Sequence, residues 1–281
     1  MSPSILSMDA VSLSFKDKRV LSDLSFSVSR GETFGFLGPS GAGKTTTIKL
    51  LTRQLHRDGG RISLFGRTID NATSADYERI GILSDTSALY ERMSIADNLR
   101  LYAQLRGASR HRVPYLLERM GLGADGKTLV KNCSKGMRQR TALAAALVHE
   151  PELLFLDEPT SGLDPAARGE VHRMLAELGA KGVTVFLTTH DMAEAETVCD
   201  RVAILSEGTV VACDRPEQLM LRYARNRIVA RTRTRGTVET TKDAAGARVL
   251  GGLLANGEAL SVHSDEPNLE EVFLELTGKE F

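Results

Sequence analysis

The chain has 281 residues, enough for one large domain or for one domain with an appendage. Its 36 basic and 36 acidic residues balance, so global charge gives no reason to expect binding to nucleic acid or to an anionic membrane. Three scattered cysteines do not suggest a disulfide framework and are typical of a reducing compartment such as the cytosol, and six histidines show no metal-ligand spacing.

The N-terminal residues carry no recognisable targeting signal. Residues 1–10 lack the basic start and the apolar core of a signal peptide, and no apolar run approaches the ~18 residues that span a bilayer. We therefore expect a cytosolic protein whose membrane role, if it has one, comes through a partner.

Two short strands follow, at residues 6–15 and 20–28, and the turn between them predicts an antiparallel flap.

A strand-like run at residues 33–37 and a helical run at residues 46–55 enclose a sequence of the form G-x-x-x-x-G-K-[ST], typical of a phosphate-binding loop. Its glycines let backbone N–H groups surround phosphates, and the following helix directs its positive end at the same anion. Lys44 would reach the β- and γ-phosphates of a nucleoside triphosphate, and the Thr45 hydroxyl would bind a bridging Mg²⁺ ion. A chance Gly-rich turn is improbable in this setting. The loop comprises Gly38, Pro39, Ser40, Gly41, Ala42, Gly43, Lys44, Thr45 and Thr46.

The middle of the chain changes from strands to helices. Short strands at residues 61–65 and 80–84 precede a helical pattern between residues 93 and 120, which breaks at Gly107 and Pro114. We interpret this part as a helical insertion between two strand-rich parts.

Strands and helices then alternate. Residues 153–156 read as a buried strand, residues 166–178 as an amphipathic helix, and residues 183–188 as another buried strand. This alternation predicts a doubly wound parallel sheet, in which ligands gather at the carboxyl ends of the strands. Three candidate site residues fall at such ends, namely Gly38, Asp157 and His190.

Two acidic residues end the strand at residues 153–156. Asp157 is placed to hold Mg²⁺ or its water beside Thr45, and Glu158 to polarise a water for in-line attack on the γ-phosphate, a role worth about 10²–10⁴-fold in rate. A solvated acidic pair is the alternative, which the four preceding apolar residues disfavour. His190 could contact the γ-phosphate and hold the attacking water, although a histidine in this position is more often a plain helix-start residue.

The C-terminal part has a different texture. A hairpin at residues 202–206 and 209–213 and a helix at residues 216–221 close the first domain, which we place at residues 1–222. Residues 223–281 read as a small α/β accessory domain. Six arginines between residues 222 and 235 are interpreted as one solvated face of an exposed strand, with lipid-headgroup or nucleic-acid binding as the alternative.

Taken together, residues 6–221 resemble the ATP-binding subunits of ABC transporters. The phosphate loop, the segment Cys133-Ser134-Lys135-Gly136-Met137-Arg138-Gln139-Arg140, residues 153–158, residues 161–164 and His190 occur in that family's order and approximate spacing. The resemblance implies a P-loop NTPase fold with a RecA-like core and a helical subdomain at about residues 86–148.

The resemblance also implies that two subunits meet head to tail around two ATP molecules. Ser134 and Gly136 would then reach the γ-phosphate bound by the partner, and Asp164 would link the two sites. Phe15, which pattern alone favours as a core residue, would stack on adenine.

Two departures from the family pattern stand out. The segment Ser-Lys-Gly-Met replaces the usual Ser-Gly-Gly-Gln and resembles the drug- and peptide-exporter branch, as does the C-terminal run at residues 267–278. Lys135 could attract phosphate or face water, and water is favoured. Asp85 occupies the position of the family's Mg²⁺- and water-binding Gln and is one methylene shorter. Residues 89–92 would line the groove for a permease's coupling helix.

The sequence therefore predicts an ATPase that binds ATP and Mg²⁺ and energises a separate transmembrane permease, with export of drugs, antibiotics or peptides as its task. We expect it on the cytoplasmic face of the plasma membrane, paired with a second copy of itself or with a related ATPase subunit, and without a nucleic-acid partner. The alternative is a soluble ABC ATPase that transports nothing, of the translation, DNA-repair or iron–sulfur assembly type.

Overall fold

The computed structural model describes residues 4–16, 18–84 and 89–278, and the chain divides into two units, residues 1–215 and 216–281. None of the helices in the described ranges is both long and apolar enough to cross a membrane.

The larger unit is built on a mostly parallel sheet. Its strand order is β10-β9-β3-β8-β7-β6, in which β10 pairs antiparallel to β9 and the other neighbours are parallel. Every residue of β3, β7 and β8 is buried, as expected for strands covered on both faces. The strands are β3 (Thr33–Leu37), β6 (Ile80–Leu83), β7 (Leu153–Asp157), β8 (Thr184–Thr189), β9 (Arg201–Ser206) and β10 (Thr209–Asp214).

An antiparallel flap packs on this sheet, as predicted. Its strand order is β2-β1-β4-β5, formed by β1 (Ser4–Phe15), β2 (Lys18–Ser29), β4 (Gly59–Leu64) and β5 (Arg67–Thr68). Phenylalanines join the two sheets: the ring of Phe26 on β2 lies 5.5 Å from Phe34, 5.3 Å from Phe36 and 5.8 Å from Phe186. Such offset aromatic contacts add to the burial of apolar area and hold the flap beside the end of β3.

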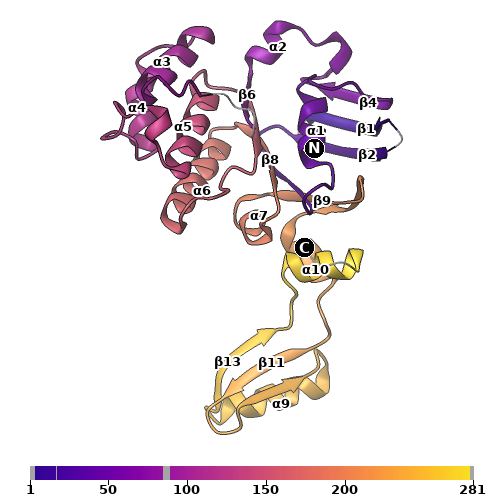
Figure 1. The fold of residues 1–281 in the computed structure, drawn as a ribbon. Helices are drawn as coiled ribbons and strands as arrows, with labels where there is room; N and C mark the ends of the chain where they lie inside the picture. Colours follow the sequence, from indigo (N-terminus) through magenta and orange to yellow (C-terminus); the bar gives the residue numbers. More distant parts are fainter. Residues whose placement is uncertain (1–3, 17, 85–88, 279–281) are drawn as a thin grey trace. The chain divides into compact units, whose positions relative to one another are not determined.

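Helices gather on the other side of the β6–β8 strands (Figure 1). The predicted helical insertion consists of α3 (Ile95–Leu105), α4 (Arg112–Arg119) and α5 (Lys135–Leu147), with the 3₁₀ turn η2 (Val130–Asn132) between the last two. Gly107 separates α3 from α4 with a φ of 62°. The break predicted at Pro114 does not occur. Pro114 lies in the first turn of α4, where proline is tolerated.

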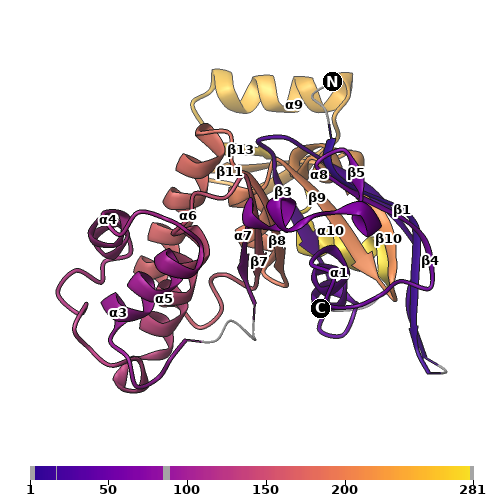
Figure 2. The same cartoon turned by 90° about the horizontal axis from the view of Figure 1, so that it is seen from above.

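The remaining helices of this unit connect its strands. The helix α1 (Lys44–Leu51) follows β3, α6 (Pro165–Ala180) links β7 to β8, and α7 (Met192–Val198) links β8 to β9. Figure 2 shows the flap strands and the helices α3 to α5 on opposite sides of the parallel strands. The turn η1 (Ile69–Asn71) and the short α2 (Ser74–Glu78) lead into β6. This arrangement confirms the predicted P-loop NTPase fold with a flap and inserted helices.

The smaller unit contains an antiparallel sheet of order β12-β11-β13, with α9 packed on it. Its elements are α8 (Pro216–Arg222), β11 (Ile228–Thr232), β12 (Thr237–Thr240), α9 (Ala244–Ala255), β13 (Ala259–Ser264) and α10 (Leu269–Thr277). The predicted boundary after residue 222 lies at the end of α8, whereas the units divide before α8, because α8 packs against α10 within the smaller unit.

The arginine-rich run includes the central strand of this small sheet. Along β11, Ala230 is buried and Arg231 is exposed, which matches the predicted alternation, and the strand lies in the middle of the three-stranded sheet. Arg227 is held by the carboxylates of Asp265, at 2.8 Å, and Glu239, at 2.9 Å.

Candidate active site

The loop between β3 and α1 has the geometry of a phosphate cradle. Gly41 and Gly43 have φ angles of 83° and 113°, which side-chain-bearing residues rarely adopt. A Cβ atom on Gly43 would lie 2.6 Å from Leu21 Cδ2, and one on Gly38 would lie 2.5 Å from the Leu205 carbonyl oxygen. The loop borders a cavity of about 300 Å³ that is lined by Ser40, Gly41, Gly43, Lys44, Thr45, Thr46 and Glu158.

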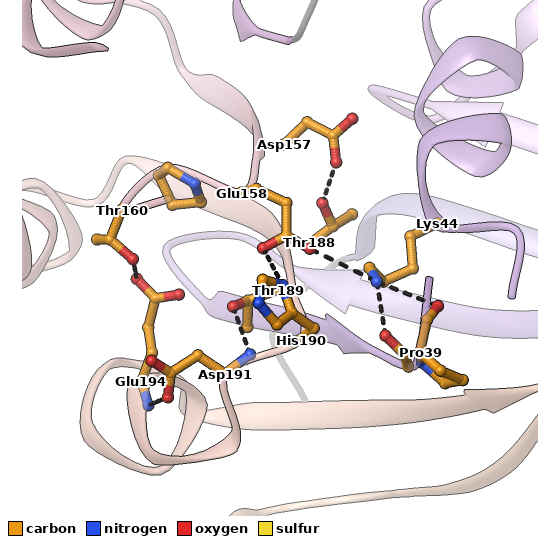
Figure 3. Close-up of polar contacts among 12 residues, drawn as sticks. Pro39, Lys44, Asp157, Glu158, Thr160, Thr188, Thr189, His190, Asp191 and Glu194 are labelled. Carbon is orange, nitrogen blue, oxygen red and sulfur yellow. Dashed lines mark hydrogen bonds and ion pairs between the residues drawn. The ribbon is translucent and has the colours of Figure 1, made fainter. Parts of the chain in front are cut away.

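Lys44, the first residue of α1, is buried at the floor of this cavity. Its Nζ donates hydrogen bonds to the carbonyl oxygens of Gly38, at 2.5 Å, and Pro39, at 3.3 Å, and lies 3.5 Å from Glu158 Oε1 (Figure 3). The carbonyl oxygens of the loop thus hold the Lys44 ammonium group within the cradle. This placement suits a point charge that binds phosphate oxygens.

Asp157 and Thr45 meet at the side of the cradle. Thr45 Oγ1 donates to Asp157 Oδ2 at 2.7 Å, and Thr188 Oγ1 donates to the other carboxylate oxygen, Oδ1. Asp157 ends β7 and Thr188 lies near the end of the neighbouring β8, so the parallel register sets their contact. Thr188, which the sequence prediction missed, thereby fixes the orientation of the carboxylate.

A hydroxyl and a carboxylate at this position fit Mg²⁺, which prefers oxygen ligands. The described residues contain no group of three or more His, Cys, Asp or Glu side chains that could hold a metal ion. Mg²⁺ usually takes only one or two carboxylates from a protein and completes its shell with water and substrate phosphates. Thr45 and Asp157 are the residues that would hold it.

Glu158 and His190 form the third side of the site. His190 Nδ1 lies 2.8 Å from Glu158 Oε2, and the Glu158 backbone N–H donates to the Thr188 carbonyl oxygen at 3.0 Å. Glu158 has a φ of 51°, an unusual conformation for a residue other than glycine, and such local strain is concentrated at functional sites. The structure thus brings Lys44, Asp157, Glu158 and His190 together, as the strand-end argument predicts.

Ser134 and Asp164 lie at helix N-termini, and no described contact joins either to the phosphate loop. Ser134 caps α5, with its Oγ accepting a hydrogen bond from the Met137 N–H at 3.1 Å. Asp164 caps α6, and the hydrogen bond from the Ala167 N–H lowers the pKa of its carboxyl group. Both caps present their side chains beside free backbone donors of a helix start.

Other predicted positions fall around this framework. Gly136 lies in the first turn of α5, and Lys135 is exposed, as favoured from the sequence, with its side chain against Gly162. Phe15 is 47% exposed, which excludes the core role that pattern alone favours and leaves its ring accessible to a planar partner, as the resemblance implies. Asp85 lies outside the described residues.

Gln139 is a second residue that the sequence prediction did not single out. Its Nε2 donates to the carbonyl oxygens of Glu158, at 3.2 Å, and Pro159, at 3.1 Å. It therefore ties α5, which Ser134 caps, to the turn that begins at the catalytic candidate Glu158. No sequence signal marks this contact, because it joins segments that are far apart in the chain.

Cavity size alone does not locate the site. A larger cavity, of about 600 Å³, lies between α4 and α6 and is lined by residues that include Tyr115, Leu116, Met174 and Leu178. None of the predicted site residues lines it. The chemistry is concentrated instead at the smaller cavity over the phosphate loop.

Comparisons with known proteins agree with this geometry. The family described as ABC transporter matches residues 21–161. The chain is 41% identical to a fluoroquinolones export ATP-binding protein of Mycobacterium tuberculosis, over 92% of this chain and 87% of that protein. It is 37% identical to the daunorubicin resistance ATP-binding protein DrrA3 of Streptomyces coeruleorubidus, over 99% and 97% of the two chains.

Among solved structures, the chain resembles an ATP-binding subunit of an ABC transporter with a TM-score of 0.75 and 29% identity, covering 98% of this chain and all of that one. The similarity therefore includes both the larger and the smaller unit of this chain. Together with the family match and the identities of the relatives, it shows that the chain belongs to the ABC transporter family, as one of its ATP-binding subunits.

Proposed function

We propose that this ATPase subunit energises a separate transmembrane permease that exports drugs, antibiotics or peptides. The observation that supports ATP hydrolysis most directly is that Lys44 and Glu158 line one cavity, with His190 in contact with Glu158 and Asp157 bonded to the lining residue Thr45. Export is supported by the relatives, whose names refer to fluoroquinolone export and daunorubicin resistance. Their similarity over most of the chain favours this function over a soluble ABC ATPase without a transport role.

The residues of the site divide the chemical work. The chemistry that Mg²⁺ would supply when bound is neutralisation of the negative charge that develops on the phosphates during transfer. Lys44 and the loop N–H groups bind the phosphates, and Thr45 with Asp157 would hold the ion. Glu158 accepts a proton from, and orients, the attacking water, while the imidazole of His190, 2.8 Å from its carboxylate, holds that carboxylate in place.

A second copy of the chain would complete the pocket. Ser134 is exposed at the start of α5, and in the described residues no interaction links it to the phosphate loop of its own copy. Because its Oγ accepts the capping hydrogen bond, the hydroxyl hydrogen stays available for a phosphate oxygen of a partner's nucleotide. The helix start adds backbone donors and a positive end, which also favour an anion.

The segment at residues 89–92 is suited to receive the permease. Tyr90 is 53% exposed, while its backbone is anchored by Asn98, whose Oδ1 accepts from the Tyr90 N–H at 2.8 Å and whose Nδ2 donates to the Tyr90 carbonyl at 3.1 Å. Leu89 lines a small cavity of about 60 Å³ with Tyr102. An exposed aromatic on a rigid segment is typical of an interface anchor. The subunit would then lie at the cytoplasmic face of the plasma membrane.

Two substitutions at Ser134 separate capping from phosphate binding. Ser134→Asp keeps a capping oxygen but presents a negative charge to phosphate, whereas Ser134→Ala removes both the cap and the hydroxyl. In the background of Glu158→Gln, which should block hydrolysis and retain nucleotide, Mg-ATP should produce a dimer in light-scattering measurements. Ser134→Asp should abolish that dimer without loss of thermal stability.

The same measurements can refute the catalytic role of Glu158 and the role of Ser134 in the dimer. Wild-type hydrolysis in the Glu158→Gln variant would refute the assignment of Glu158. A Glu158→Gln variant that stays monomeric with Mg-ATP, or dimerises equally well with Ser134→Asp, would refute the clamp. Export itself is tested by ATP-dependent uptake of a fluoroquinolone into inverted vesicles that contain the copurified permease.

A further inference from the structure

A buried carboxylate lies next to the candidate site without being part of it. Glu194, in the first turn of α7, is 2% exposed. Thr160 Oγ1 donates to its Oε1 at 2.7 Å (Figure 3), and His172 Nε2 on α6 lies 3.2 Å from the same oxygen. The other oxygen, Oε2, is buried and has no hydrogen-bond partner in the part of the chain that the structure describes. A charge buried in this way is costly unless a partner compensates it.

The surrounding charges point to His172 as that partner. A second ion pair joins the same two helices, because Arg168 Nη1 on α6 lies 2.6 Å from Asp191 Oδ2 at the start of α7. Arg168 and His172 are four residues apart and therefore share one face of α6. Since Arg168 is bound to Asp191, His172 is the side chain on this face of α6 that is left to donate a hydrogen bond to Glu194. Cys199 also lies near Glu194, and burial keeps its thiol protonated by raising its pKa.

Thr160 and Glu194 each lie a few residues after one of the two residues at the reaction centre. Thr160 is two residues after Glu158, and Glu194 is four residues after His190. The Glu194 N–H also donates to Asp191 Oδ1 at 2.9 Å, which fixes the start of α7 directly after His190. The 2.8 Å contact between Glu158 and His190 therefore depends on two segments that Thr160 and Glu194 hold together.

We propose that His172 and Glu194 are positioning residues for ATP hydrolysis: they form a buried hydrogen-bonded pair that, through Thr160, sets the distance between Glu158 and His190. This inference rests on the proposed roles of Glu158 and His190. In the described residues, no contact joins His172 or Glu194 to the phosphate loop. The pair therefore affects the chemical step and leaves nucleotide binding unchanged.

The test compares His172→Gln and Glu194→Gln with matched controls on exposed residues, His111→Gln and Glu170→Gln. The first two variants should lower kcat by about 10- to 100-fold, because a misplacement of about 1 Å at reacting groups can cost ~10²-fold. Their KM for ATP should change by less than about 2-fold, since ground-state binding is untouched. The double variant should be no slower than the slower single variant, because partners in one pair are not additive. Both controls should match the wild type.

Two further measurements keep the test decisive if the buried variants fold poorly. Thr160→Val removes only the linking hydroxyl and should reproduce the loss in kcat at constant KM. In the unmodified protein, side-chain ¹⁵N spectra should show a proton on His172 Nε2, because an unprotonated nitrogen facing Glu194 Oε1 would be repulsive.

The outcomes distinguish this inference from the proposed function. An unprotonated His172 Nε2, wild-type kcat in all three variants, or a rise in KM at unchanged kcat would overturn the positioning role. Glu158→Gln, measured in parallel, reports on the proposed function itself. If Glu158→Gln is inactive while the three variants hydrolyse ATP normally, only the inference fails; if Glu158→Gln is fully active, the proposed function fails.

Discussion

Replacing Thr188 by valine tests whether the orientation of Asp157 matters for catalysis. Thr188 is fully buried, and its hydroxyl donates to Asp157 Oδ1, while Thr45 donates to Oδ2 at 2.7 Å. Valine has nearly the same shape, so Thr188→Val removes the donor and leaves one oxygen of a buried carboxylate without a partner. That loss costs about 2 kcal/mol, in the range for hydrogen bonds to charged groups.

Two effects should follow from this single change. The melting temperature should fall by about 4–8 °C, the shift expected from ~2 kcal/mol in a domain of this size. The concentration of Mg²⁺ needed for half-maximal ATPase activity should rise, or kcat should fall, by about 10- to 100-fold, as is typical when a residue that orients a metal-binding carboxylate is lost.

Thr184→Val provides the control, because Thr184 lies at the other end of β8 and is also fully buried. Its hydroxyl accepts from the Gly31 N–H at 2.9 Å, far from the phosphate loop along the strand. Thr184→Val should therefore cost about 1 kcal/mol of stability without changing Mg²⁺ dependence. If the two variants show the same ATPase activity and Mg²⁺ dependence, the orienting role of Thr188 is refuted.

Three further predictions concern the cradle and the acid stability of the fold. Lys44→Ala should weaken ATP binding by about 10- to 100-fold in calorimetry, and unchanged affinity would contradict its role as the phosphate cation. Gly43→Ala should weaken binding by about 10-fold or more, because a φ of 113° and a contact of 2.6 Å with Leu21 strain the loop. Hydrogen bonds from Arg79 lower the pKa of Glu152 from 4.5 to about 2. Glu152 thus stabilises the folded state above pH 4.5 and loses that contribution as the pH falls toward 2. Melting temperatures measured between pH 4.5 and 2 should therefore fall less steeply in Glu152→Gln than in the wild type. An equally steep fall in both proteins would exclude Glu152 as a source of the pH dependence.

The sequence identified those parts of the site that lie where strands end. Asp157 follows four apolar residues, and His190 follows an apolar strand, so a parallel sheet places both at one edge. The order of the strands could not be read in the same way. Thr188 looks like an ordinary strand threonine, and its contact with Asp157 exists only because β8 lies beside β7, which tertiary packing decides.

Exposure and packing partners are properties that local patterns predict poorly. Pattern alone favours Phe15 as a core residue, because aromatic residues are usually buried, whereas the family resemblance implies an accessible ring; Phe15 ends a strand at the rim of the flap and is exposed. The helix α8 follows the hairpin directly in sequence, yet it packs with α10, more than forty residues later. Local patterns predict elements, whereas their partners follow from contacts that span the chain.

A rule about helix starts explains which functional residues a sequence reveals. In this fold the strands β3, β7 and β8 lead to the N-termini of α1, α6 and α7, where the first N–H groups need an acceptor and where an anionic ligand is favoured. The residues that cap these helices must therefore be of a few types, and those types leave a signature in the sequence. The N-caps of α1, α6 and α7 are Gly43, Asp164 and Asp191, and Ser134 caps α5 in the helical insertion. Residues that act from within an element, such as Gln139 and Glu194, satisfy no such local requirement. Their selection depends on side-chain contacts between distant segments, so only the folded structure reveals them.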